Sequence, residues 1–171
     1  MIRLLTGSTH TGKTLLAQRL LERHGAPYLS IDHLKMGLIR SGMCPLTPES
    51  PDEALTAVLW PVVREIVKTA VENGQSLTVE GCYIPFNWRE DFDASCLPHI
   101  RFLCLVFSEA YIRTRFDAIQ THANAIERRK DDSFCTMELL LAENRRNLEA
   151  CRRRGLPYYL IDGPYALPLD W

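Results

Sequence analysis

The chain has 171 residues, and this length predicts one domain that can bury its own core. Apolar residue types make up 46% and charged types 24%, and 20 basic against 21 acidic residues leave a formal net charge of −1 at pH 7. These values exclude an extended disordered chain, a collagen and a polycation that coats nucleic acid.

The sequence carries no signal for a membrane span, secretion or a zinc site. Charged residues interrupt every apolar run before it reaches the length of about 18 residues that a membrane helix needs. The segment from Met1 to Gly7 lacks the layout of a signal peptide. We therefore expect a cytoplasmic protein that binds neither membrane nor nucleic acid. No two cysteines have CxxC spacing, and we expect reduced, mostly buried thiols at Cys44, Cys82, Cys96, Cys104, Cys135 and Cys151.

The first half of the chain alternates predicted strands with predicted helices. Short apolar runs that end in Gly or an acidic residue are typical of buried parallel strands, and apolar residues spaced by three to four predict helices. These patterns predict strands over 2–6, 27–31 and 76–79. They predict helices between Gly12 and Gly25, over 33–40, and from Ser50 to Gly74.

The third helix has two features that predict its local shape. Ser50 followed by Pro51 and Glu53 predicts an N-cap with a capping box. Pro61 removes a backbone donor within the helix, so we expect a kink or a division into two helices near Trp60.

The second half repeats the alternation of strands and helices. Strands are predicted over 100–107 and 158–161, with helices over 109–121, where Ser108 is the cap, and from about Met137 to Gly155. Strands that alternate with helices predict right-handed crossovers and a parallel sheet covered on both faces. No repeat or linker is visible, so we expect one α/β domain over 1–171.

The most informative segment is the octapeptide from Gly7 to Thr14, which fits the pattern G-x-x-x-x-G-K-[ST] without a mismatch. Its glycines let backbone N–H groups surround an anion at the start of a helix, while Lys13 reaches the β- and γ-phosphates and the Thr14 hydroxyl holds Mg²⁺. A predicted strand before the loop and a helix after it favour a nucleotide triphosphate site over a structural turn. The residues expected to bind the nucleotide are Gly7, Ser8, Thr9, His10, Thr11, Gly12, Lys13, Thr14 and Leu15.

From this motif onward the chain resembles the P-loop small-molecule kinases of the adenylate-kinase-like group. The similarity extends to Asp32 after the second strand, Glu80-Gly81 after the third, and the turn at Asp162-Gly163. It also includes the arginines of the helix over 109–121 and the segment Arg129-Lys130-Asp131-Asp132. The resemblance implies a three-layer α/β/α sandwich with strand order 2-3-1-4-5, ATP and Mg²⁺ as cofactors, an acceptor-binding region at about 32–60 and a lid at about 122–135.

The same resemblance implies roles for individual side chains, each with a structural alternative. Asp32 would orient or deprotonate an acceptor hydroxyl, or cap the following helix. Glu80 would bind Mg²⁺ through water or hold the acceptor, or form a salt bridge at a strand end. Lys35 and Arg40 would bind an anionic acceptor, or lie on a solvated helix face. Tyr83 would contact an organic acceptor together with Phe86 and Trp88, or cover the edge of the core.

Arginines are the candidates for the lid. Arg129 is expected to contact the transferred phosphate, and Arg113 and Gly163 to contact the nucleotide. The further contenders among the arginines are Arg115, Arg128 and Arg145.

The sequence thus predicts an ATP- and Mg²⁺-dependent kinase, monomeric or weakly dimeric, that phosphorylates a small molecule. The chain lacks the Phe-Pro-Arg-Thr segment with which adenylate kinases bind AMP. Besides a nucleotide, acceptors such as nucleosides, phosphorylated metabolites, sugars and antibiotics are therefore equally compatible. The alternatives are a regulatory NTPase, for which the GTPase tetrapeptide Asn-Lys-x-Asp is missing, and an ATP-binding module without turnover.

Overall fold

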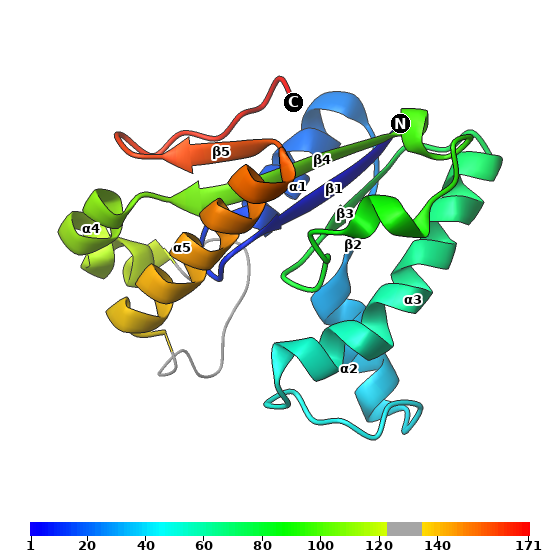
Figure 1. The fold of residues 1–171 in the computed structure, drawn as a ribbon, viewed down its shortest axis with the longest axis horizontal. Helices are drawn as coiled ribbons and strands as arrows, with labels where there is room; N and C mark the ends of the chain where they lie inside the picture. Colours follow the sequence, from blue (N-terminus) through cyan, green and yellow to red (C-terminus); the bar gives the residue numbers. More distant parts are fainter. Residues whose placement is uncertain (123–134) are drawn as a thin grey trace.

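A computed structural model describes residues 1–122 and 135–171 of the chain. Its centre is a sheet of five parallel strands in the order β2-β3-β1-β4-β5, which confirms the predicted order (Figure 1). The strands are β1 (Ile2–Gly7), β2 (Tyr28–Ser30), β3 (Leu77–Glu80), β4 (Ile100–Phe107) and β5 (Tyr158–Ile161).

Helices cover both faces of this sheet. They are α1 (Lys13–His24), α2 (Ile31–Arg40), α3 (Asp52–Glu72), α4 (Glu109–Thr121) and α5 (Met137–Arg154), with short 3-10 helices η1 (Trp88–Asp91) and η2 (Leu97–His99). Successive side chains of a strand point to opposite faces. Leu4 of β1 accordingly packs in one cluster with α3, whereas Leu5 packs in another with Leu16 and Leu20 of α1. The molecule is therefore the predicted three-layer sandwich.

The helix α3 differs from its prediction in two respects. Of the two alternatives at Pro61, the division into two helices is wrong: α3 continues as one helix, because its buried stripe of Leu55, Leu59, Val63 and Val67 outweighs the roughly 3 kcal/mol that an interior proline costs. Its N-cap is Pro51 and no side chain caps it. The predicted capping box is wrong because the Ser50 hydroxyl accepts a hydrogen bond from the Thr47 amide at 3.0 Å instead.

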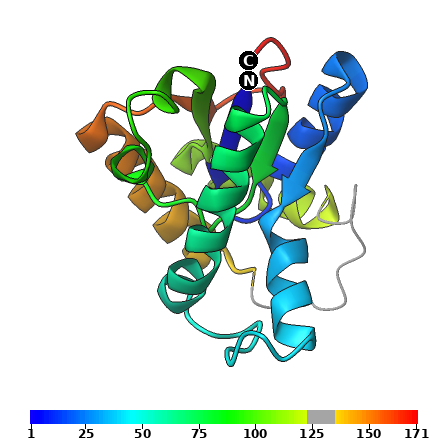
Figure 2. The same ribbon diagram turned by 90° about the vertical axis from the view of Figure 1, so that its right-hand side faces the viewer.

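The second strand is shorter than predicted, and the helix after it begins earlier. β2 ends at Ser30, which is the N-cap of α2, and Ile31 is already helical. Figure 2 shows α2 continuing directly from β2. Asp32 therefore lies in the first turn of α2, and the alternative in which it caps the helix is wrong.

Other local predictions hold. The Ser108 hydroxyl accepts a hydrogen bond from the Tyr111 amide at the start of α4, and Gly155 ends α5 with a positive φ of 60°. All six cysteines are free thiols, and five of them are buried. Among the described residues, no helix combines the length and the apolar character that spanning a bilayer requires.

Candidate active site

The predicted anion-binding loop connects β1 to α1 at the carboxyl edge of the sheet. Gly7 and Gly12 have φ values of 145° and 88°, a region that favours glycine. A Cβ atom on Gly7 would overlap the backbone carbonyl of Leu105 in β4, so the loop passes too close to the sheet for any side chain there. His10 also has a positive φ, of 64°. The loop thus wraps around the amino end of α1, where free N–H groups and the helix dipole attract an anion.

The side chain of Lys13 lies against this loop. Its Nζ donates a hydrogen bond to the Ser8 carbonyl at 2.8 Å, and the residue is 8% exposed. Burial opposes the charge of Lys13, but Cys82, Glu80 and Asp32 outweigh that effect and leave its pKa raised. The ammonium group therefore stays charged beside the loop, where an anionic ligand would sit.

Two oxygen ligands lie together beside the loop. The Thr14 hydroxyl is 3.4 Å from Glu80 Oε1, and Glu80 is 1% exposed at the end of β3. Oxygen atoms of hydroxyl and carboxylate groups are suitable ligands for Mg²⁺. These two residues therefore fit a magnesium ion beside the loop.

A second group of side chains surrounds Lys35. Its Nζ contacts Asp32 Oδ1 at 2.7 Å and donates to the Tyr83 hydroxyl at 2.9 Å. The Asp32 side chain is 49% exposed, whereas Lys35 is 12% exposed. Three predicted acceptor residues, from the first turn of α2 and the segment after β3, are thus brought together. The ring of Tyr83, 6% exposed, belongs to the core cluster together with Trp88, which stacks on Phe102 at 5.9 Å, and Phe86 packs against this cluster.

The structure adds acidic residues that the sequence did not point to. Glu143 of α5 accepts a hydrogen bond from the Ser8 hydroxyl, so α5 touches the loop directly. Asp52, at the start of α3, interacts electrostatically with Glu143 and Asp32, and its pKa is raised by partial burial and then by Glu143. Neither residue belongs to a short motif, so only the packing of α3 and α5 could place them here.

A residue near the end of the chain, Tyr165, contacts the loop. The Tyr165 hydroxyl donates to the Thr11 carbonyl at 3.3 Å, and a Cβ atom on Gly12 would overlap that hydroxyl. Burial is the main cause that raises the pKa of Tyr165 to about 12, so its hydroxyl stays protonated. Gly163 lies in the turn before this segment.

The predicted arginines are scattered. Arg113 is 55% exposed and pairs with Glu109 of its own helix at 2.8 Å, and Arg145 contacts the same carboxylate at 3.5 Å. Arg40 is exposed at the last residue of α2, and Arg115 has a non-helical conformation inside α4. Arg128, Arg129 and nearly all of the predicted lid lie outside the described residues. Within residues 1–122 and 135–171, Arg113 and Arg145 form their ion pairs with Glu109 rather than with the loop.

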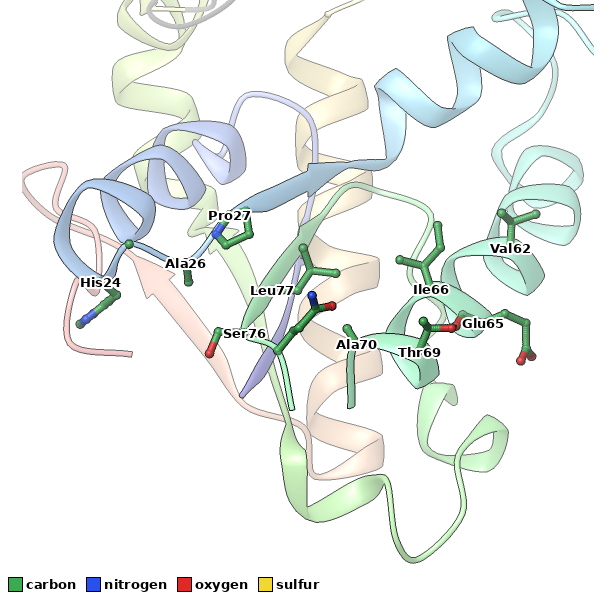
Figure 3. Close-up of a pocket in the computed structure, with 12 residues that line it drawn as sticks. His24, Ala26, Pro27, Val62, Glu65, Ile66, Thr69, Ala70, Ser76 and Leu77 are labelled. Atoms are coloured by element: carbon green, nitrogen blue, oxygen red, sulfur yellow. The ribbon is translucent and has the colours of Figure 1, made fainter. Parts of the chain in front are cut away.

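A groove of about 800 Å³ lies elsewhere, between α3 and the beginnings of β2 and β3. Figure 3 shows Pro27 and Leu77 on its sheet side and Ile66 and Ala70 on α3. Since ligands of open α/β sheets bind at the carboxyl ends of the strands, this groove at the amino ends is not the candidate site. No group of three or more His, Cys, Asp or Glu residues that could hold a metal occurs in the described part of the chain.

Comparison with solved structures identifies the class of fold. The chain is similar to a gluconokinase from Sinorhizobium meliloti 1021, with TM-score 0.53 and 18% identity over 98% of this chain and 84% of that one. It is also similar to a deoxyadenosine kinase from M. mycoides, with TM-score 0.57 and 10% identity over 97% and 92%. A shikimate kinase from Aquifex aeolicus vf5 gives TM-score 0.52 and 12% identity over 97% and 88%.

The fold is therefore that of the P-loop small-molecule kinases of the adenylate-kinase-like group. No protein-family model matches the chain, and a search of curated proteins found no match.

Proposed function

We propose that the protein is an ATP- and Mg²⁺-dependent kinase that phosphorylates a hydroxyl group of a small molecule. The observation that carries the proposal is the meeting of four chemically matched side chains at one edge of the sheet. Lys13 interacts electrostatically with Glu80 and Asp32, and Thr14 contacts Glu80. Phosphoryl transfer requires this set: a cation and a metal site at the phosphates and a carboxylate at the acceptor.

Each residue has a defined task in the proposed reaction. The loop amides and Lys13 bind the phosphates, and Thr14 and Glu80 hold the metal. Asp32 orients the acceptor hydroxyl and accepts its proton as the oxygen bonds to phosphorus. Bound ATP supplies the γ-phosphoryl group, whose bond to the β-phosphate oxygen breaks to leave ADP. Because no covalent intermediate with the protein is needed, positioning and charge supply the catalysis.

Mass spectrometry tests this proposal without knowledge of the acceptor. The protein is incubated with ATP, Mg²⁺ and a metabolite extract, and we expect one class of metabolite to gain a phosphoryl group. Asp32→Asn should reduce the rate by about 10²- to 10⁴-fold, the usual contribution of a general base. Asp117→Asn, which changes an exposed carboxylate of α4, is the matched control and should be fully active.

Two results would contradict the kinase assignment. ATP binding without product from any extract would support the ATP-binding module instead. An Asp32→Asn variant with wild-type turnover would remove Asp32 from the reaction.

A further inference from the structure

Lys35 is already paired with two side chains. Its Nζ contacts both Asp32 and Tyr83, at 2.7 and 2.9 Å, and its side chain is 12% exposed. Burial opposes its charge, but the hydrogen bond to Asp32 outweighs that effect and raises the pKa of Lys35. The positive charge of Lys35 is therefore permanent and already neutralised by Asp32.

The contact with Lys35 determines what Tyr83 can offer a ligand. An ammonium group can only donate, so the phenol oxygen is the acceptor of this hydrogen bond and the phenol hydrogen points elsewhere. Burial is the main cause that raises the pKa of Tyr83 to about 12, so this hydrogen is present at neutral pH. Although Tyr83 is 6% exposed, its hydroxyl lies beside Lys35 and the 49% exposed side chain of Asp32, and it can offer a donor there.

Asp32 offers the complementary group. Its Oδ1 contacts Lys35, which leaves Oδ2 to accept a hydrogen bond. Because Asp32 and Tyr83 bond to one nitrogen, their oxygens are close enough to contact neighbouring oxygens of one small molecule. One hydroxyl would donate to Asp32, and the adjacent hydroxyl oxygen would accept from Tyr83.

The surrounding charge disfavours an anionic acceptor. Within the described part of the chain, the charged side chains that interact around this space are four carboxylates and three cations, namely Asp32, Asp52, Glu80, Glu143, Lys13, Lys35 and Arg146. Lys35 is paired with Asp32, and the two other cations, Lys13 and Arg146, stand against three carboxylates, so the space keeps a net negative charge. A phosphate or carboxylate on the acceptor would be repelled.

We infer that Lys35 is a positioning residue, which holds Asp32 and Tyr83 as a pair for two neighbouring hydroxyl groups of an acceptor that carries no anionic group. This inference rests on the proposed kinase function and specifies its substrate class. It replaces the expectation that Lys35 binds an anion on the acceptor.

Matched acceptors that differ in one anionic group test the substrate class. Suitable pairs are glucitol with gluconate, ribose with ribose 5-phosphate, and adenosine with AMP, each assayed for ATP-dependent phosphorylation beside the metabolite extract. We expect the uncharged member of any reacting pair to have at least a tenfold higher kcat/KM, and the product from the extract to derive from an acceptor without an anionic group. Preference for an anionic acceptor would overturn the inference and leave the kinase assignment intact. No transfer to any acceptor would overturn the kinase assignment and, with it, the inference.

Substitutions separate positioning from binding on the preferred acceptor. Lys35→Met should lower kcat at least tenfold, because Asp32 loses the group that orients it. Tyr83→Phe should raise KM about tenfold with kcat within twofold, because only one hydrogen bond to the acceptor is lost. Lys68→Met removes a lysine of α3 in the same i,i+3 arrangement, at 3.1 Å from exposed Glu65, and should leave both constants unchanged.

A different pattern would contradict the positioning role. If Lys35 bound an anion, Lys35→Met would raise KM for anionic acceptors and leave turnover of uncharged ones unaffected. Thermal unfolding of each variant shows whether it is folded. Should Lys35→Met fail to fold, the KM and kcat of Tyr83→Phe decide, and an unchanged KM in that variant would overturn the inference.

Discussion

Gly7 connects the backbone of the sheet with the shape of the loop. Its φ of 145° and the closeness of the Leu105 carbonyl leave no room for a side chain. The strand β1 can therefore continue to Gly7, in register with Leu105, and turn at once around the candidate phosphate position. Backbone freedom at this single residue determines where the amides of the following loop point.

The first prediction compares two glycines. Gly7→Ala should destabilise the protein by about 2–4 kcal/mol. Alanine would have to adopt the positive φ that glycine tolerates, and its Cβ atom would overlap the Leu105 carbonyl. Gly37→Ala is the matched control, since Gly37 lies inside α2 with no atom near its Cβ position. It should stabilise the protein by about 0.5–1 kcal/mol.

Urea unfolding of both variants measures these differences. Equal stability of Gly7→Ala and the wild type would show that the loop does not pass the sheet as described.

At this scale the sequence predicted the residues of the loop but not their neighbours. Lys13 and Thr14 could be assigned because the octapeptide requires each residue type at a fixed spacing. Lys35 was placed near the acceptor, but its enclosure depends on Tyr83, which is distant in the sequence. Glu143 could not be found, because nothing local distinguishes it from the other charged residues of α5.

The helix α3 illustrates how packing overrides local preference. Pro61 lacks an N–H for the carbonyl of Ala57 and yet stands within a continuous helix of 21 residues. Its side chain is exposed, while the opposite stripe of the helix is buried against the sheet. The free energy of that burial keeps the helix intact, and a local rule about proline could not include it.

The second prediction follows from this imbalance. Pro61→Ala should stabilise the protein by about 2 kcal/mol, because the helix regains a backbone hydrogen bond while the unfolded chain gains some entropy. Since α3 is packed away from the loop at this point, kinase activity should not change. A lower melting temperature of Pro61→Ala would mean that the proline is accommodated without cost.

Element boundaries were predicted best where a single residue determines them. Gly155 ends α5 because glycine readily adopts the left-handed conformation of a C-cap. Ser108 begins α4 because its hydroxyl caps the first turn. Both effects depend on one residue. The start of α3 was predicted wrongly, since Ser50 uses its hydroxyl within its own turn with Thr47. Such competition between two nearby partners cannot be decided from residue types.

For the whole molecule, alternation of strands and helices predicted a parallel sheet, and the family resemblance supplied its order. The structure adds the return of the chain end to the first strand. Arg3 Nε donates to the Trp171 carbonyl at 3.3 Å, and Leu167 packs against the cluster that contains Leu5. Together with Tyr165 beside the loop, these contacts hold residues 165–171 along β1, from its carboxyl end to its amino end.

Binding of a nucleotide triphosphate by the loop from Gly7 to Thr14 can be measured by isothermal titration of the wild type and of Lys13→Ala with ATP and Mg²⁺. We expect one site per chain in the wild type, and at least tenfold weaker binding in Lys13→Ala at an unchanged unfolding temperature. No binding by folded wild-type protein, or equal affinity in the two proteins, would show that the loop is not a nucleotide site.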